Sequence, residues 1–281
     1  MPDIFFIYEA KSARDLIRTC QRLALVAMSG DWSFRGQGDS TWELRPSLLR
    51  KVPDGFSPQE FEKNLLNDLR RVLHLKTTLP EHLIEDENFR LSYAQHYRVP
   101  TRLTDWTRDP LVALYFAASD AMREVVLSGK RGGKLSVFAL ADIYLTVGDA
   151  SKRGAFVRPP AGGNANLTAQ RAHLLKHAWE TPDLLDGLVP RSTDDPVKNV
   201  NPLISSRFIR LDLGWDQAWN VVDLLMKIGL TADLVYPSED GLVRLAADLA
   251  LGSDVLRLTG GPQSTPSNPE DDSTSLSDFD D

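Results

Sequence analysis

The chain has 281 residues, 42% hydrophobic and 25% charged, and this ordinary globular composition excludes a collagen, a coiled-coil rod and a wholly disordered protein. No stretch approaches the ~20 apolar residues of a membrane-spanning helix, and residues 1–9 lack the basic start of a signal peptide. The single cysteine, Cys20, excludes an internal disulfide framework and a multi-cysteine metal site. We therefore expect a soluble, cytoplasmic protein.

Acidic residues are concentrated near the C-terminal end. The net charge is −7, but residues 261–281 hold six acidic residues and no basic one, so the rest of the chain is nearly neutral. This stretch is rich in Gly, Pro, Ser, Thr and Asp and cannot bury a core, which predicts disorder. It is either a solubilising end or an arm that docks, through Leu276 and Phe279, on a basic partner or on a basic cleft of its own chain. We predict one domain over residues 1–260 followed by this tail.

The N-terminal half alternates helices with short extended pieces. Apolar residues at helical spacing predict a helix over residues 13–28, with Ser12 as its N-cap. A short aromatic run ended by two glycines predicts a strand and tight turn at residues 32–38, and a second extended piece follows at 42–48. Beyond it, two helices are predicted at residues 58–75 and 89–97, followed by a loop around residue 100. A buried helix with a proline in its first turn is predicted at residues 111–122.

The C-terminal half mixes strands and helices without a regular strand–helix rhythm. We expect a loop over residues 149–166 and, between 167 and 179, a strand followed by a helix. The other predicted elements are strands at 134–140 and 208–213 and helices at 217–228 and 241–251. This arrangement favours an α+β fold over a doubly wound sheet.

One polar motif ends the predicted strand at residues 32–38. In Phe34-Arg35-Gly36-Gln37 an arginine precedes a glycine, so a planar guanidinium could meet a phosphate close to backbone N–H groups. The structural alternative is that Arg35 pairs with a core carboxylate such as Asp105 and braces the fold.

A denser polar segment leads into the buried helix at 111–122. Backbone dipoles at a helix N-terminus favour an anionic ligand, so these side chains could form a binding site. The alternative is that Asp105 or Thr107 caps the helix and Arg102 pairs with Asp105. The segment contains Gln95, His96, Arg102, Asp105, Trp106 and Thr107.

A third polar stretch spans residues 164–174 and includes Gln170 and Arg171. His173 and His177 could share a helix face, but basic neighbours and the absence of an H-E-x-x-H frame argue against a metal site. The sequence also lacks a phosphate-binding P-loop, a G-x-G-x-x-G dinucleotide motif and a G-x-S-x-G nucleophile elbow.

Together these segments resemble the FRG domain family, over about residues 15–250. The resemblance is carried by Phe34-Arg-Gly-Gln, by Trp42-x-Leu-x-Pro-Ser-Leu-x-Arg50, and by the signature that runs from Gln95-His-Tyr-x-Val-Pro-Thr-Arg-Leu-x-Asp-Trp-Thr to the buried helix. Residues 164–174, and residues 209–249 with Tyr236-Pro-x-x-Asp-Gly, resemble the later motifs of the family.

The same parts resemble, more weakly, ADP-ribosyltransferases of the arginine–serine–glutamate class. That resemblance implies an ADP-ribosyltransferase-like mixed sheet with flanking helices and a site for NAD. Arg35 would hold the pyrophosphate, Thr107 would anchor the nicotinamide ribose, and Tyr97 or Trp106 would stack on the nicotinamide. Gln170 lies where that class has its catalytic glutamate, with Glu43 and Glu180 as substitutes. The remaining members of the implied NAD-binding set are Gln37, His96, Arg102 and Asp105.

Three functions follow as hypotheses. The first is an NAD-dependent ADP-ribosyltransferase-like effector, a bacterial toxin or anti-phage protein, that modifies a protein or nucleic acid or cleaves NAD, with an inhibitory or activating protein partner. The second is a non-catalytic nucleotide- or protein-binding module. The third is a nuclease using His96 and Arg102, for which the sequence offers no carboxylate cluster to hold a metal.

Overall fold

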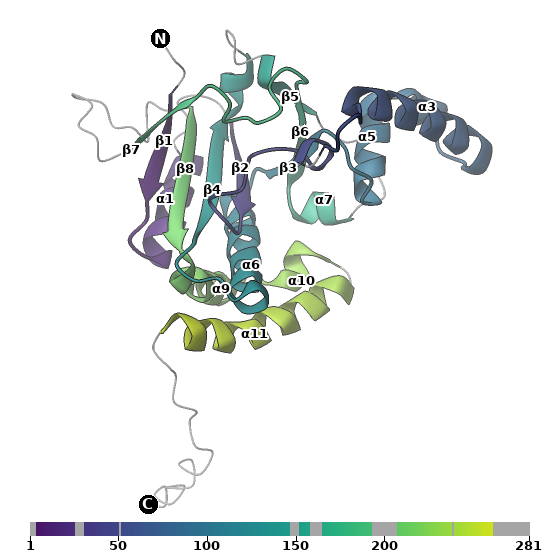
Figure 1. The fold of residues 1–281 in the computed structure, drawn as a ribbon. Helices are drawn as coiled ribbons and strands as arrows, with labels where there is room; N and C mark the ends of the chain where they lie inside the picture. Colours follow the sequence, from purple (N-terminus) through teal and green to yellow (C-terminus); the bar gives the residue numbers. More distant parts are fainter. Residues whose placement is uncertain are drawn as a thin grey trace, which may run out of the picture.

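A mixed sheet runs through the part of the chain that the computed structural model describes, which is residues 4–25, 31–50, 52–146, 152–157, 165–192, 207–237 and 239–260. The strand order is β5-β6-β3-β2-β4-β8-β1-β7, and the pairs are antiparallel except where β1 lies parallel to β7 and β8 (Figure 1). The strands are β1 (Ile4–Glu9), β2 (Trp32–Gln37), β3 (Leu103–Thr107), β4 (Lys134–Ala141), β5 (Gly154–Val157), β6 (Ala172–His177), β7 (Val189–Ser192) and β8 (Phe208–Gly214).

Helices flank this sheet, which confirms the α+β prediction. Figure 1 shows α6 behind β2 and β4, with α9 and α11 below, and α6 packs directly on β2. Two short 3-10 helices, at Asp142–Thr146 and Trp215–Gln217, follow β4 and β8. The α-helices are α1 (Ala13–Leu25), α2 (Ser47–Arg50), α3 (Pro58–Lys76), α4 (Glu81–Glu85), α5 (Glu87–His96), α6 (Pro110–Ser128), α7 (Ala165–Ala169), α9 (Ala218–Lys227), α10 (Ala232–Val235) and α11 (Glu239–Thr259).

The main core lies between α6 and the sheet. Alternate residues of β4 point to opposite faces, so Val137 joins the core under α6 while Phe138 joins a second cluster on the other face. Both side chains are fully buried, which explains why residues 137–141 of β4 form a continuous apolar run. Because apolar clusters cover both of its faces, β4 is a buried central strand of the sheet.

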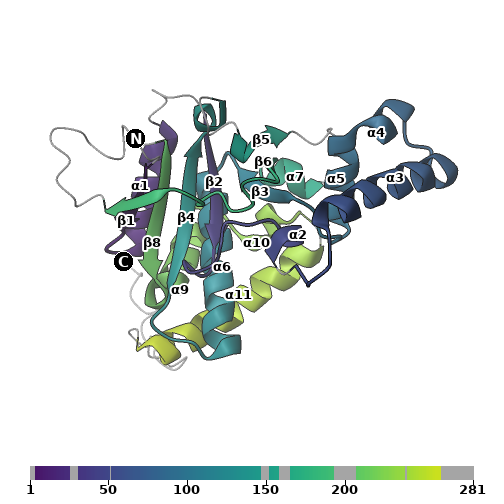
Figure 2. The ribbon, with the colours of Figure 1, turned by 45° about the horizontal axis from the view of Figure 1, so that its top comes forward.

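Three helices, α3, α4 and α5, extend to one side of the sheet and are called the helical arm below (Figure 2). The arm has a small core of its own, built from Leu73, Ile84 and Phe89. Its contact with the sheet is another small cluster, in which Leu66 and Leu91 meet side chains of β3 and β6. Few apolar groups therefore join the arm to the body.

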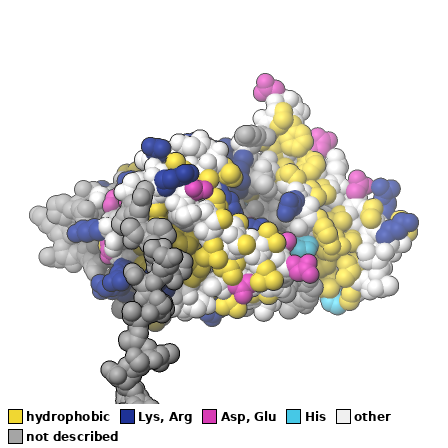
Figure 3. All heavy atoms as spheres, turned by 90° about the horizontal axis from the view of Figure 1, so that it is seen from below, with side chains coloured by type: hydrophobic (Ala, Val, Ile, Leu, Met, Phe, Trp, Pro, Cys, Tyr) yellow, Lys and Arg dark blue, Asp and Glu magenta, His cyan; other side chains and the backbone are white. Residues whose placement is uncertain are grey.

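A partly apolar face lies over α10 and α11, below the sheet in the view of Figure 1. Seen from below, hydrophobic side chains gather over α10 and α11 (Figure 3). Leu234, Leu242, Val243 and Leu249 are among the exposed large hydrophobic residues there.

Most predicted elements are confirmed. The helices predicted at 58–75, 89–97 and 111–122 correspond to α3, α5 and α6, and Ser12 accepts a hydrogen bond from the N–H of Asp15 in the first turn of α1. The cap of α6 is Asp109, which accepts from the N–H of Leu111, rather than Asp105 or Thr107.

Three predictions about local structure were wrong. Between 167 and 179 the helix α7 precedes the strand β6, the reverse of the expected order. The loop expected over 149–166 contains β5, and the piece at 42–48 runs into the helical turn α2. The loop expected around residue 100 is present, but the strand β3 that follows it was not predicted. The predicted acidic tail, residues 261–281, lies outside the described residues, so the division at residue 260 stays a prediction.

Candidate functional site

The sheet opens between β2 and β3. These two strands pair only at Phe34 and Thr107, whereas β2 pairs with β4 along its whole length. Past that single pair, the guanidinium of Arg35 bridges the gap and donates from Nη1 to the backbone oxygen of Asp105 at 2.7 Å. An arginine side chain thus takes the place of the ladder hydrogen bonds at the opening.

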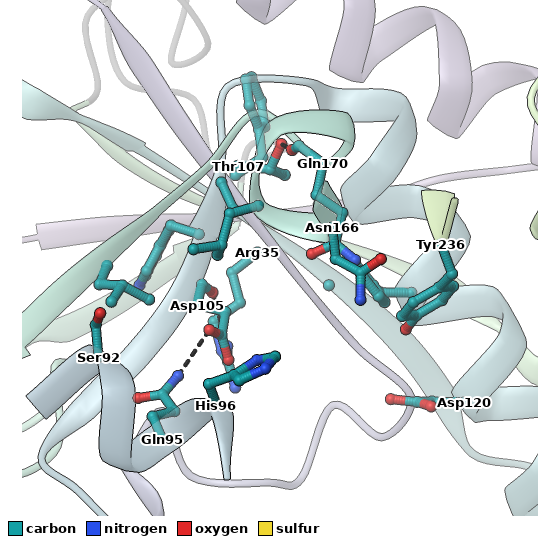
Figure 4. Close-up of a pocket in the computed structure, with 17 residues that line it drawn as sticks. Arg35, Ser92, Gln95, His96, Asp105, Thr107, Asp120, Asn166, Gln170 and Tyr236 are labelled. Atoms are coloured by element: carbon teal, nitrogen blue, oxygen red, sulfur yellow. Dashed lines mark hydrogen bonds between the residues drawn. The ribbon is translucent and has the colours of Figure 1, made fainter. Parts of the chain in front are cut away.

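A cavity of about 400 Å³ occupies this opening, and we call it the first pocket. Side chains from the sheet, the end of α5, the middle of α6, the α7 turn and the residue after α10 meet around it (Figure 4). Its polar lining consists of Arg35, Ser92, Gln95, His96, Asp105, Thr107, Asp120, Asn166, Gln170 and Tyr236.

Arg35 makes no ion pair with a carboxylate among the residues that the structure describes. Its hydrogen bond to Asp105 goes to a backbone carbonyl, and its buried Nε has no hydrogen-bond partner within the described residues. Burial lowers the pKa of Arg35, the charge of Asp105 acts in the opposite sense, and the charge of Arg50 lowers it further. Because arginine stays protonated in proteins, this is a cation partly stripped of water and available to an anion.

The Asp105 carboxylate projects into the first pocket and is positioned by a relay. Thr101 Oγ1 donates to Gln95 Oε1 at 2.9 Å, which fixes the amide so that Gln95 Nε2 donates to Asp105 Oδ1 at 2.7 Å (Figure 4). Loss of hydration raises the pKa of Asp105, against the charge of Arg35 and the hydrogen bond from Gln95. The pocket therefore holds a carboxylate in place with a neutral partner.

A second carboxylate, Asp120, lies on the opposite side of the pocket, near Tyr236 (Figure 4). Asp120 is ion-paired with Arg123 at 3.0 Å, and burial is the largest cause of its raised pKa. The Tyr236 ring meets Phe116 edge-on at 5.9 Å and carries the guanidinium of Arg244 at 4.2 Å from its centroid. This wall offers an aromatic surface held by packing on two sides.

Sequence reasoning did not single out Asp120, Tyr236 or Asn166 as site residues. A signal existed for Asp120, because it is an acidic residue within a helix whose neighbours are mostly buried and apolar. Tyr236 begins the Tyr236-Pro-x-x-Asp-Gly motif, but only long-range packing brings it to the pocket.

Thr107 and Gln170 line the first pocket but are engaged in holding it together. The Thr107 hydroxyl donates to the backbone oxygen of Gln170 at 2.6 Å and accepts from the N–H of Asp109. The Gln170 side chain donates to the backbone oxygen of Val235 at 3.1 Å. These bonds tie β3, the α7 turn and α10 to one another.

Three members of the expected NAD-binding set lie away from the cavity or in the core. Arg102 pairs with the nearly buried Glu62 at 2.7 Å, rather than with Asp105, and does not line the pocket. Tyr97 is 61% exposed and does not line it either. Trp106 does line the pocket, but its indole is buried in the second cluster and donates to Thr104, so little of the ring is open for stacking.

Gln37 and Glu43 border a neighbouring cavity rather than the first pocket. Glu180 is exposed and lines neither cavity. Of the residues expected from sequence, Arg35, His96, Asp105, Trp106, Thr107 and Gln170 line the first pocket.

The two buried histidines of β6 have structural partners. His173 Nε2 lies 2.9 Å from Ser33 Oγ, and Ser33 donates to Asp142 at 2.6 Å, so the carboxylate contacts the serine and not the imidazole as a catalytic triad would require. Within the described residues, no group of three or more His, Cys, Asp and Glu side chains could hold a metal ion.

Comparison with known proteins identifies one family. Residues 30–125 match the model of the FRG domain, a segment that runs from β2 through most of α6 and includes Arg35, Gln95, Asp105 and Asp120. No curated protein and no solved structure matches the chain. Across the described ranges, no helix is both long and apolar enough to span a membrane.

Proposed function

We propose that this protein, whose residues 30–125 match the FRG domain, binds NAD in the pocket around Arg35 and cleaves the bond between nicotinamide and ribose. The ADP-ribose is transferred to a macromolecule, a protein or nucleic acid, or to water. An enzyme that consumes NAD or modifies a macromolecule suits a toxin or an anti-phage effector, held silent by an inhibitory protein partner.

One observation carries this proposal: a guanidinium held by a backbone carbonyl and an ordered carboxylate share one cavity of about 400 Å³. NAD has matching groups, because its pyrophosphate is anionic and its nicotinamide ring is cationic. Arg35 offers planar N–H donors to the pyrophosphate. Asp105 offers negative charge to the nicotinamide ribose.

The proposed step breaks the C1′–N bond, and its electron pair stays on the nicotinamide nitrogen, which neutralises the ring. Positive charge then develops at C1′ and the ribose ring oxygen, where a fixed carboxylate stabilises it. An oxygen of water or of the acceptor forms the new C1′–O bond, and its proton passes to solvent. All atoms and charges are accounted for without a further reactant.

Asp105 is assigned the carboxylate role in place of Gln170. Glutamine carries no charge, and the Gln170 amide already donates to Val235. Asp120 is neutralised by Arg123 at 3.0 Å, whereas the hydrogen-bond partner of Asp105 is the neutral Gln95. Asp105 therefore has the negative charge that is more available to a substrate.

The alternative is a pocket that binds a nucleotide without cleaving it. Gln170 and Thr107 favour this alternative. Gln170 stands where a glutamate is expected, and the Thr107 hydroxyl already hydrogen-bonds the backbone of Gln170 and of Asp109. Binding without turnover is the outcome that would support this second function.

Nicotinamide release from NAD by the purified chain, with and without cell lysate, tests the proposal. We expect Arg35→Ala and Asp105→Asn each to lower kcat/KM by about a hundredfold, the usual scale for losing one electrostatic contact to the transition state. Dependence on lysate would indicate a macromolecular acceptor.

Asp105→Asn separates catalysis from folding. The asparagine oxygen can still accept from Gln95, and the raised pKa of Asp105 means that its ionised form costs stability above its pKa. Its melting temperature at pH 7 should therefore not fall. Full activity in this variant, or no nicotinamide release by the folded native protein, would refute the proposal. The proposal would also fail if Arg35→Ala had a much lower melting temperature but kept full activity.

A further inference from the structure

A second cavity of about 400 Å³ adjoins the first pocket, and we call it the second pocket. Arg35, Gly36 and Asp120 line both cavities, so Arg35 stands where they meet. The rest of the second pocket comes from the end of β2 and from the segment between β2 and α3. Its lining is completed by Gln37, Trp42, Glu43 and Arg50.

Two guanidinium groups face this cavity, and backbone carbonyls hold both of them. Arg35 Nη1 donates to Asp105 O at 2.7 Å, and Arg50 Nε donates to Arg45 O at 3.1 Å. Neither has an ion pair with a carboxylate within the described residues. A carbonyl orients a guanidinium without cancelling its charge, so the two keep their attraction for an anion.

The carboxylates that line the second pocket are already paired. Glu43 contacts Arg45 at 3.2 Å, and Asp120 contacts Arg123 at 3.0 Å. The charge of Arg50 also lowers the pKa of Arg35, so the two cations are close enough to interact across the cavity. Positive charge near Arg35 and Arg50 is therefore the least compensated part of this pocket.

Trp42 gives the second pocket an aromatic surface. It lines the cavity and is 39% exposed, unlike Trp32 and Trp106, which are in the core. An exposed indole beside two cations is a combination suited to a nucleotide, because a base stacks on the ring while the guanidinium groups bind its phosphate.

We propose that the second pocket binds the adenosine monophosphate half of the dinucleotide, with the purine on Trp42 and the phosphate between Arg35 and Arg50. This inference rests on the proposed function, because it divides NAD between two cavities that meet at Arg35. The shared lining residue then contacts the pyrophosphate, and the nicotinamide ribose lies in the first pocket beside Asp105.

Calorimetric titrations of the full chain with AMP, nicotinamide mononucleotide and inorganic pyrophosphate test the assignment. We expect Trp42→Ala and Arg50→Ala each to weaken AMP binding about tenfold, the scale of one lost stacking or charged contact. Binding of nicotinamide mononucleotide should stay unchanged. Arg71→Ala is the matched control, because Arg71 is exposed on α3 and lines neither pocket.

The outcomes separate this inference from the proposed enzyme. The second-pocket assignment would be overturned if AMP did not bind, or if AMP bound equally well to the native chain and to both variants. It would also be overturned if pyrophosphate bound as tightly as AMP and Trp42→Ala had no effect on AMP binding. NAD cleavage with an unchanged KM in both variants would overturn it while leaving the enzyme in place. AMP binding that needs Trp42 and Arg50, without any nicotinamide release, would support the second pocket and overturn the enzyme.

Discussion

A single buried histidine, His177, links the stability of this fold to pH. His177 is fully buried at the end of β6, with Nδ1 at 3.2 Å from the oxygen of Pro182 and Nε2 at 2.9 Å from Thr104 Oγ1. A neutral ring satisfies both contacts by donating from Nδ1 and accepting at Nε2. Burial lowers the pKa of His177 from 6.5 to about 3.

This shift predicts that acid destabilises the protein through His177. The unfolded chain binds a proton near pH 6.5 and the folded chain does not until about pH 3. Stability contributed by the neutral ring is therefore complete above pH 6.5 and is lost as the pH falls towards 3, at up to about 1.4 kcal/mol per pH unit. Denaturant unfolding measured between pH 7 and pH 4 would show the loss.

The variant His177→Gln isolates this contribution, because its amide can also donate and accept but does not titrate. We expect a flatter acid dependence than in the native chain. His82→Gln, at an exposed position on α4, should keep the native slope. Equal slopes in all three proteins would contradict the assignment to His177.

Gly36 explains, at the scale of elements, why the opening motif has a glycine after its arginine. A Cβ at Gly36 would lie 2.0 Å from the backbone oxygen of Ala113 and 2.7 Å from the backbone nitrogen of Ala117. The helix α6 therefore rests directly on the β2 backbone. The contact between β2 and α6 therefore positions Arg35 of β2 and Asp120 of α6, which both line the first pocket.

Gly36→Ala should lower the free energy of unfolding by about 3 kcal/mol, at the upper end of overpacking costs, because the clashing atoms are backbone and cannot rotate away. Gly55→Ala is the comparison: Gly55 has a φ of +77° but nothing within 4 Å of its Cβ position, so only about 1 kcal/mol of backbone strain is expected. Thermal unfolding of the two variants measures the difference. Equal losses would show that α6 does not press on β2 at this point.

Local patterns predict the strong helices and strands because one apolar face is enough to define them. The period of α3 and the continuous apolar run of β4 are both visible in the sequence. By contrast, β3 reads as polar, since its Thr104, Asp105 and Thr107 serve the pocket and its neighbours instead of forming an apolar stripe. Because these polar residues break the apolar pattern, β3 was not predicted from the sequence.

The same division holds for the candidate site. Arg35, His96 and Asp105 stand in dense polar motifs, and the structure gathers them around one pocket. Asp120 and Tyr236 are added by helix packing over long sequence separations, which no local pattern reports. Arg102 was assigned to the site from the same motif, yet its charge is used to bind Glu62 in the helical arm.

At the scale of the whole molecule, the first pocket lies between the sheet body and the helical arm. Ser92, Gln95 and His96 come from α5 in the arm, while Arg35 and Asp105 come from the sheet. Arg102, next to β3, reaches Glu62 of α3 at 2.7 Å, and the two side chains are 16% and 5% exposed. This ion pair and a small apolar cluster hold the arm against the body.

Glu62→Ala should therefore loosen the arm before the body. Arg102 keeps its hydrogen bond to the backbone oxygen of His177 at 3.2 Å, which limits the expected cost to about 1–3 kcal/mol. Hydrogen exchange should rise in α3 and α5 while β4 stays protected, because the remaining ion pairs between arm and body, such as Lys176 with Glu87 at 3.4 Å, are longer and more exposed. Ligand affinity should fall with it, since Gln95 positions Asp105 from α5.

A matched control separates the buried pair from an ordinary surface pair. Asp68→Ala removes the 3.0 Å contact with Arg71 on the same helix, where both side chains are mostly exposed and the pair is worth at most about 1 kcal/mol. That variant should leave arm protection and ligand affinity unchanged. If Glu62→Ala instead speeds exchange equally in α5 and β4, the arm and the body unfold as one unit, and the two sides of the pocket cannot move independently.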